Sequence, residues 1–231
     1  MSSPTLTFYF KRGACSLASH SLLHHLSMPF TPVEMKNNGN RQVEAADGSL
    51  TYEEYLKVNP AGLVPAIVVD GGEVITEQTA VLTYIVSVAS AENQKLLGTG
   101  PLHRARVVEW LTWLSGTFHG TAVTSCTRPN LFADGEEAKK DVLAKGWERI
   151  LACYARVEER LKGREFAVGD ELTVVDFYLY VFRRWAVYMT GLGGSQFGEK
   201  FPSFEKLGRK IEALEGVQKT LKIEDQKPVY E

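Results

Sequence analysis

The strongest constraint on the fold is a change of pattern at residues 90–101. Before it, short apolar and β-branched runs alternate with stretches of helical spacing, whereas no later segment is typical of a strand. The pattern predicts strands over 6–10, 30–35, 66–69 and 73–76, and helices over 15–26, 51–58 and 81–88. The order β-α-β-α-β-β-α begins with a βαβ unit, which favours a parallel pair of strands, and ends in an antiparallel hairpin. We therefore expect a small α/β domain in the first third of the chain.

The remainder of the chain is expected to be all-α. Apolar residues keep helical spacing over three stretches, 107–118, 143–161 and 204–214. A fourth stretch, 173–182, is apolar nearly all round, so it is expected to run through the middle of the helical part. Thr173 and Asp176 have the spacing of a capping box at its start. The predicted organisation is an α/β domain, a linker and an all-α domain over 1–89, 90–101 and 102–231.

Composition excludes several classes of protein. With 44% hydrophobic and 23% charged residues, the 231-residue chain has the usage of a globular protein and not of a disordered or fibrous one. Its 26 basic and 28 acidic residues give a formal net charge of −2, so generic nucleic-acid binding is not expected. No apolar run approaches the roughly 18 residues of a membrane-spanning helix, and the N-terminus lacks the pattern of a secretory signal. The scattered cysteines favour neither a disulfide framework nor a metal site, which indicates a reduced, cytosolic setting for Cys15, Cys126 and Cys153.

The first candidate site is Gly13-Ala14-Cys15-Ser16, where a strand ends and a thiol begins a helix. The unpaired N–H groups and positive dipole end of a helix would lower the pKa of Cys15, and the Ser16 hydroxyl adds a donor beside it. The alternative is a cysteine that packs against the strand or serves as a replaceable cap. The pattern at this segment gives no preference between a reactive thiol and a structural one.

Two further segments could bind parts of a ligand. Within 59–66, a cis Val64–Pro65 bond would leave the Val64 backbone groups free for a ligand's peptide, although an ordinary turn with trans prolines is the commoner case. At the start of the next helix, backbone N–H groups near Gln78 suit a carboxylate and Glu77 suits an ammonium group. An acidic first turn without a ligand is again the commoner explanation. Because the three segments can converge at one edge of the sheet, together they predict a site for a small thiol-containing peptide.

These residues make the chain resemble a cytosolic glutathione transferase over nearly its whole length. The segment Asn59-Pro60-Ala61-Gly62-Leu63-Val64-Pro65-Ala66 resembles the cis-proline motif of the family's thioredoxin-like N-terminal domain. Glu77-Gln78 stands at the family's γ-glutamyl-binding pair, and Thr173-Val174-Val175-Asp176 resembles the capping box of its all-helical C-terminal domain. The resemblance is greatest to the bacterial beta class, through the Cys15 segment together with His20, Trp110-Leu111, His119 and Trp185.

The resemblance implies glutathione as co-substrate, with no metal, and a set of site residues. Cys15 would contact the glutathione sulfur, with Ser16 beside it and His119 pointing in from the helical domain. Without the family, an ordinary surface or core histidine would be the favoured explanation of His119. The peptide and the γ-glutamyl group would lie against Leu63, Val64, Pro65, Glu77 and Gln78. In the loop, Asn38 aligns with the residue that contacts the glycine end of glutathione, with Lys36 and Arg41 as alternatives. The apolar wall for the acceptor would come from Trp113, Phe118, Trp185 and Tyr188, although each of these could instead be a core residue.

The chain departs from the beta-class pattern at three places. Gln78 replaces the usual Ser or Gly, although its amide can still bind a carboxylate. Gly120 stands where the pattern has a lysine after the histidine, and the loop over 36–50 is longer than usual. These departures bear on the second substrate more than on glutathione.

The implied function is conjugation of glutathione to a small apolar electrophile, in a detoxifying or biosynthetic role that includes secondary metabolism. Two alternatives stay open: Cys15-dependent thiol–disulfide exchange, deglutathionylation or glutathione-dependent isomerisation on the same fold, and a non-catalytic protein that binds glutathione or apolar ligands. The family also implies a homodimer. Because the stripe over 102–125 contains Trp110, Trp113 and Phe118, we expect it to be too wide for one inward face and to be covered by a second copy. Neither a nucleic acid nor a membrane is an expected partner.

Overall fold

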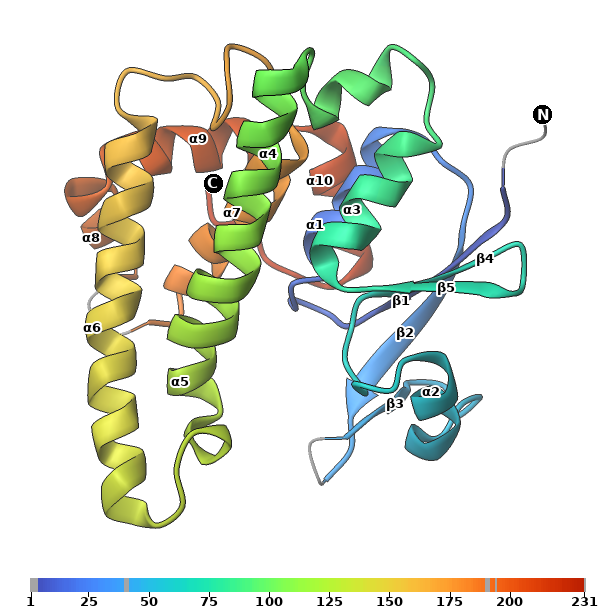
Figure 1. Ribbon diagram of the computed structural model, residues 1–231, viewed down its shortest axis with the longest axis horizontal. Helices are drawn as coiled ribbons and strands as arrows, with labels where there is room; N and C mark the ends of the chain where they lie inside the picture. Colours follow the sequence, from blue (N-terminus) through green and yellow to red (C-terminus); the bar gives the residue numbers. More distant parts are fainter. Residues whose placement is uncertain (1–3, 40–41, 190–191, 194, 231) are drawn as a thin grey trace.

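The computed structural model describes residues 4–39, 42–189, 192–193 and 195–230, and shows two parts side by side (Figure 1). The first part contains a five-stranded sheet in the order β3-β2-β1-β4-β5. In chain order the strands are β1 Leu6–Phe10, β2 Thr31–Asn37, β3 Val43–Ala45, β4 Ala66–Val69 and β5 Glu73–Thr76. β1 and β2 are parallel, with Phe8 opposite Pro32, and all other neighbours in the sheet are antiparallel. The predicted βαβ unit and the β4–β5 hairpin are thereby confirmed.

Strand β3 is an addition to the predicted pattern, which has a loop over 36–50. It pairs antiparallel with the end of β2, and Met35 lies opposite Ala45. Val43 and Ala45 are buried, so this edge of the sheet belongs to the core. A strand of three residues is too short to show the alternation by which strands are recognised in a sequence.

Helices cover both faces of the sheet. Helices α1 and α3 lie on the face toward the rest of the protein and α2 on the other (Figure 1), with bounds α1 Leu17–His25, α2 Tyr52–Val58 and α3 Gln78–Ser87. The alternation along β1 explains this, because Phe8 joins the main core while Tyr9 packs on Tyr55 of α2. Thr51 and Glu54 form a capping box at the start of α2. The alternating side chains of β1 therefore provide a packing surface for helices on each face of the sheet.

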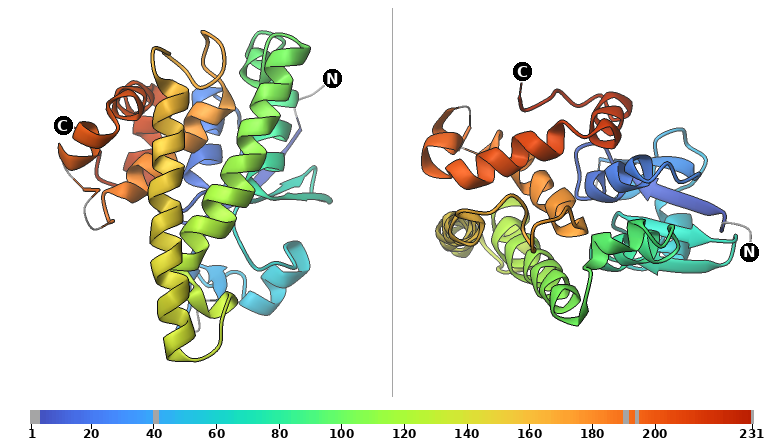
Figure 2. Two further views of the ribbon diagram at one scale, coloured as in Figure 1. Left: turned by 60° about the vertical axis from the view of Figure 1, so that its left-hand side comes forward. Right: turned by 90° about the horizontal axis from the view of Figure 1, so that it is seen from above.

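The second part is helical throughout its described residues. After a short 3₁₀ helix, η1, come α4, the π-helix η2, α5 and the 3₁₀ helix η3, with bounds η1 Asn93–Leu97, α4 Pro101–Trp113, η2 Leu114–Val123, α5 Thr124–Thr127 and η3 Pro129–Leu131. They are followed by α6 Glu136–Leu161, α7 Val174–Ala186, α8 Ser195–Lys200, α9 Pro202–Glu212 and α10 Glu215–Ile223. Figure 2 shows α6 running antiparallel beside the α4–α5 segment. The last helix, α10, returns to pack on α1, and a Cβ at Gly216 would lie 2.4 Å from the backbone nitrogen of His25.

Helix α7 is the central helix that the sequence predicts. All its residues except Trp185 are buried. The Asp176 carboxylate accepts hydrogen bonds from the backbone N–H of Thr173 and of Ala167, each at 2.8 Å. These bonds satisfy the start of a helix that has no access to water, although burial raises the pKa of Asp176 to about 6.

The aromatic residues of the stripe over 102–125 do not need a second copy to bury them. Trp110 and Phe118 are fully buried within this one chain, and Trp113 packs between them at ring distances of 5.9 and 5.7 Å. The guanidinium of Arg160 covers the ring of Trp110 at 3.7 Å. Cation–π contacts and the neighbouring helices of the same chain therefore cover these aromatic side chains.

Candidate functional site

A cavity of ≈640 Å³ lies between the α/β part and the helical part, within the usual range for small-molecule sites. From the α/β part it is lined by residues 11–15, by residues 63–65 and by the start of α3. From the helical part it is lined by η2, by the segment up to residue 128, by α6 and by the end of α7. The three predicted segments thus meet at one cavity. We call residues 11–16, which join β1 to α1, the thiol turn.

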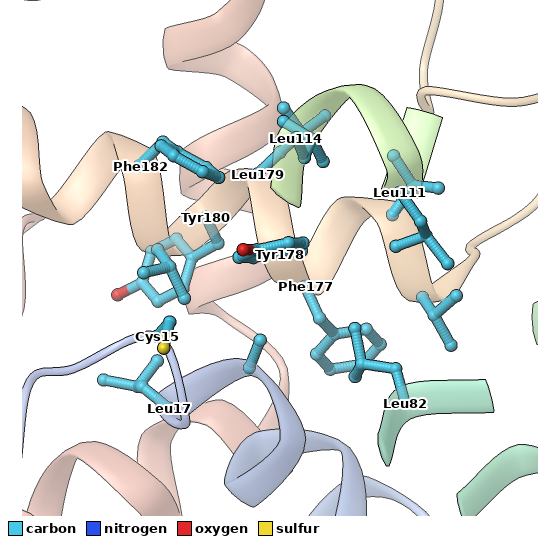
Figure 3. Packing of buried hydrophobic residues seen from close by; sticks show 14 of the residues in the cluster. Cys15, Leu17, Leu82, Leu111, Leu114, Phe177, Tyr178, Leu179, Tyr180 and Phe182 are labelled. Atoms are coloured by element: carbon cyan, nitrogen blue, oxygen red, sulfur yellow. The ribbon is translucent and has the colours of Figure 1, made fainter. Parts of the chain in front are cut away.

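Cys15 lies at the cavity on the thiol turn, just before α1 and beneath α7 (Figure 3). Its Sγ donates a hydrogen bond to the carbonyl oxygen of Val64 at 3.3 Å, and the Val64–Pro65 peptide bond is cis. Burial raises the pKa of the Cys15 thiol to about 11, against the lowering effects of the Ser16 N–H and the Lys11 charge. The expected lowering of this pKa is therefore wrong for the ligand-free protein, because desolvation outweighs the helix N-terminus.

Ser16 does not face the cavity. Its hydroxyl accepts a hydrogen bond from the backbone N–H of Lys11 at 3.1 Å and donates one to the carbonyl oxygen of the same residue at 3.2 Å. Ser16 is fully buried, and α1 begins only at Leu17. The hydroxyl therefore closes the thiol turn. The donor beside the Cys15 thiol is the backbone N–H of Ser16, and not the hydroxyl that the sequence suggested.

Glu77 and Gln78 line the opposite edge of the cavity at the start of α3. Glu77 is exposed and adopts a φ of 69°, a left-handed conformation that is rare for a residue other than glycine. Gln78 is buried, and its Nε2 donates to Ser19 Oγ at 2.9 Å. Its Oε1 is buried with no hydrogen-bond partner among the described residues. The amide is therefore bonded to Ser19 and its Oε1 is enclosed by the protein, whereas the sequence suggested that it would bind a carboxylate.

His119 enters the cavity from the π-helix η2. Its Nδ1 lies 3.2 Å from the hydroxyl of Tyr178, and its ring lies 5.0 Å from that of Trp185. Burial, with a contribution from the charge of Arg128, lowers the pKa of His119 to about 4. The imidazole is thus neutral near pH 7 and can accept or donate one hydrogen bond at each nitrogen.

The helical part holds the thiol turn directly. Trp185 lines the cavity, and its Nε1 donates to the carbonyl oxygen of Gly13 at 3.0 Å. On the other side of the same residue, the Gly13 N–H donates to the buried carboxylate of Glu224 at 2.8 Å. The second oxygen of Glu224 lies 2.8 Å from Nδ1 of His20, so this histidine supports the turn from below and does not line the cavity.

Several predicted site residues lie elsewhere. Trp113 and Phe118 pack inside the helical part and do not line the cavity, because α4 and η2 turn these faces inward. Asn38 and Lys36 also lie outside its lining: Asn38 Nδ2 donates to Gln42 Oε1 at 3.0 Å, and Lys36 pairs with Glu44. Arg41 lies outside the described residues. Leu63, Val64, Pro65, Trp185 and the highly exposed Tyr188 do line it.

The cavity also contains residues that the sequence analysis missed. The cations at its wall are Lys11, Arg12 and Arg128, and Tyr178 lies between Cys15 and His119. The position of Lys11-Arg12 directly before the thiol turn was an available signal, whereas nothing in the pattern marked Arg128 or Tyr178. Within the described residues, no group of acidic, histidine or cysteine side chains could hold a metal, and no helix is long and apolar enough to cross a membrane.

The structure explains why residue 120 is a glycine. In the wide turns of η2, a Cβ at this position would lie 2.9 Å from the carbonyl oxygen of Ser115. A lysine, as in the beta-class pattern, would force the helix to change its winding. The replacement of that lysine therefore accompanies a local π-helix at the cavity, where such elements are often found.

A thiol bonded to a cis-proline segment, at a cavity that helices close from the other side, is the arrangement of a thioredoxin-like domain joined to a helical domain. Family models described as the glutathione S-transferase N-terminal and C-terminal domains match residues 14–88 and 117–215. The glutathione S-transferase GstA of Escherichia coli O157:H7 is 31% identical over 181 residues, which cover 78% of this chain and 82% of that protein. The glutathione S-transferase GST-4.5 of Xanthomonas campestris is 33% identical, with the same coverages. The chain therefore belongs to the glutathione S-transferase family.

Solved structures agree with this assignment. A sphingomonad glutathione S-transferase complexed with glutathione is 29% identical, with a TM-score of 0.76 and coverage of 96% of this chain and 100% of that one. The bacterial beta class enzyme of Sphingomonas chungbukensis is 28% identical, with a TM-score of 0.76 and coverage of 94% and 98%. The family resemblance read from the sequence is confirmed, and beta-class proteins are among the structural relatives.

Proposed function

We propose that this protein binds glutathione in the cavity and conjugates its sulfur to a small apolar electrophile. The observation that carries the proposal is the convergence of the Cys15 thiol, the Val64 backbone and the start of α3 on one cavity. The relatives support it, because one solved structure is described as complexed with glutathione. Glutathione enters as a co-substrate, and no metal is part of the proposal.

The residues at the cavity suit the parts of glutathione. Glu77 is an exposed carboxylate at the cavity that can pair with the γ-glutamyl ammonium. Backbone N–H groups at the start of α3 suit the α-carboxylate. Val64, between Leu63 and Pro65, would pair with the peptide, which brings the glutathione sulfur toward Cys15. Asn38 is a less favourable contact for the glycine end, because its side chain is bonded to Gln42.

The proposed step is a displacement in which the glutathione thiolate forms a C–S bond as a halide leaves with its bonding electron pair. The thiol proton passes to solvent or to the neutral imidazole of His119. Cys15 would donate its S–H to the thiolate, exchanging its present bond to Val64 for one to the substrate. Trp185, Tyr188, Met189 and Trp147 would form the apolar wall on the acceptor side.

The test is calorimetric binding of glutathione, followed by turnover of 1-chloro-2,4-dinitrobenzene. We expect saturable binding, a conjugation rate above the uncatalysed one, and a marked loss of turnover in Cys15→Ala. Cys153→Ala is the matched control, because Cys153 is a buried cysteine of α6 outside the cavity. Absence of binding at millimolar glutathione would refute the proposal, and binding without turnover of several electrophile classes would favour a non-catalytic carrier.

Thiol–disulfide exchange is the second candidate, and the position of the Cys15 thiol itself favours it. Glutathione disulfide would be attacked by the Cys15 thiolate, giving a Cys15–glutathione disulfide and one free glutathione; a second glutathione thiolate would then release Cys15. Mass spectrometry after incubation with glutathione disulfide tests this step. Modification of Cys15 with conjugation retained in Cys15→Ala would assign Cys15 to exchange. Glutathione-dependent isomerisation is a further reaction that the same cavity would support.

We also infer a homodimer in the cytoplasm, mainly from the family. The exposed apolar side chains of Leu102 and Val108 on α4 support a partner surface, with 67% and 59% of each exposed. Light scattering at micromolar concentration tests this inference. A mass near 25.7 kDa would contradict it, because that is the mass of one chain.

A further inference from the structure

The helical side of the cavity contains a cation that no carboxylate neutralises. Arg128 lines the cavity between α5 and η3 and is half-buried. Its backbone N–H bonds to the carbonyl oxygen of Thr124 at 2.8 Å, but in the described part of the chain its guanidinium has neither an ion-pair nor a hydrogen-bond partner. Arg12, the other arginine at the cavity, is bound by Glu34 at 2.7 Å. Arg128 is therefore available to a ligand in a way that Arg12 is not.

The surroundings of Arg128 are those of an acceptor site. Apolar and aromatic side chains of the helical part line the cavity with it, among them Trp147, Ile150 and Met189. Among the described residues that line the cavity, Glu77 alone is acidic, and it lies just before α3 on the α/β side. A ligand with a flat apolar body and one anionic group would satisfy both the wall and the guanidinium, which binds carboxylates through two parallel hydrogen bonds.

Arg128 also lies close enough to the reacting end of the cavity to matter for chemistry. Its charge contributes to the lowering of the pKa of Lys11 and of His119, after burial in each case. Lys11 in turn acts on the Cys15 thiol. A small aromatic ligand held by Arg128 therefore has its reactive carbon within the same cavity as the thiol.

We propose that Arg128 selects electrophiles that carry a carboxylate on an apolar or aromatic body. The inference rests on the proposed conjugation and adds a substrate class to it. During the displacement the carboxylate stays ionised and bound to Arg128, while the C–S bond forms and the halide leaves. Glutathione has carboxylates of its own, so the test must separate the two sources of the anion.

The experiment compares 4-chloro-3,5-dinitrobenzoate with the neutral 4-chloro-3,5-dinitrobenzamide, which share the leaving group. For each protein, the measured quantity is the ratio of kcat/KM for the benzoate to kcat/KM for the benzamide, so that intrinsic reactivity cancels between variants. We expect this ratio to fall about tenfold or more in Arg128→Gln, the loss typical of a charge-assisted hydrogen-bonded pair. Arg128→Lys should retain an intermediate ratio, because it keeps the charge and loses the forked geometry.

Arg149→Gln is the matched control, because Arg149 is an exposed arginine on α6 outside the cavity lining and its loss changes the net charge equally. We expect the wild-type ratio in this variant. An unchanged ratio in Arg128→Gln would overturn the inference while leaving conjugation intact. A rise in KM for glutathione with an unchanged ratio would overturn it as well, by assigning Arg128 to a glutathione carboxylate. Turnover of 1-chloro-2,4-dinitrobenzene but of neither of these compounds by the wild type would overturn the inference and leave conjugation intact, whereas turnover of none of the three would overturn both.

Discussion

The buried carboxylate of Glu224 should be one of the most costly side chains to remove. It lies at the end of α10, is fully buried, and accepts the Gly13 N–H at 2.8 Å while its second oxygen lies 2.8 Å from His20 Nδ1. Glu224→Ala removes both bonds and leaves two polar groups without partners in a site closed to water. At about 1.5–3 kcal/mol for each hydrogen bond to a charged group, the free energy of unfolding should fall by about 3–6 kcal/mol.

Two further variants make the magnitude interpretable. Glu224→Gln keeps an acceptor and adds a donor in the same shape, so its loss should be about 1–2 kcal/mol. Asp225→Asn, at the next residue, alters an exposed ion pair with Arg12 at 3.9 Å, and a change within about 0.5 kcal/mol is expected. Asparagine is chosen there because Asp225 has a φ of 52°, which asparagine tolerates.

The assay is urea denaturation monitored by tryptophan fluorescence, and conjugation is measured in parallel. Because the Gly13 bond positions the thiol turn, turnover in Glu224→Gln should fall more than its small loss of stability explains. The reasoning is refuted by a Glu224→Ala protein whose free energy of unfolding lies within about 1 kcal/mol of the wild type. Such a result would mean that the Trp185 bond and the packing of α1 on α10 hold the turn without the carboxylate.

Three other perturbations test separate features of the site. Gly120→Ala places a Cβ 2.9 Å from the Ser115 carbonyl oxygen and should destabilise the protein by about 1–3 kcal/mol. Gly116→Ala has open space at its Cβ and should not destabilise it, and thermal unfolding of both variants tests the difference. Trp185→Phe removes the hydrogen bond to the thiol turn and should cost about 1 kcal/mol in urea denaturation. With a pKa of about 11, the Cys15 thiol of the ligand-free protein should be alkylated by iodoacetamide about tenfold faster per pH unit between pH 7 and 10; a plateau below pH 9 in peptide mass spectrometry would contradict this.

The fold was largely predictable because its signals are local. The short apolar run over 6–10, the hairpin of strands 66–69 and 73–76 and the capping spacing of Thr173 and Asp176 each need only neighbouring residues, and each of these elements formed where expected. Strand β3 was not predictable in this way, since its three residues are defined by their pairing with β2. The π-helix η2 likewise continues the spacing of α4 and shows no break in the pattern.

Short sequence motifs marked only the α/β side of the cavity, whereas on the helical side His119, Trp185 and Tyr188 were named through the family resemblance. Cys15, Val64 and Gln78 follow turns and helix starts within the α/β domain, so short motifs mark them. The pKa of Cys15 could not be predicted from its motif, because α7 and η2 bury the thiol and these helices are far along the chain. For the same reason Trp113 was a poor choice and Arg128 was missed: helical spacing says which residues share a face, but not which face meets the cavity.

This asymmetry has a consequence for specificity. Under the proposed roles, the α/β domain supplies the groups that suit glutathione, and residues 115–128 with α6 and the end of α7 supply the acceptor wall. Trp185 and Glu224 fix the thiol turn between the two, through the backbone carbonyl and N–H of Gly13. Acceptor residues such as Arg128 can therefore change without displacing the thiol. Such a division of the cavity permits the second substrate to vary while the groups that bind glutathione stay the same.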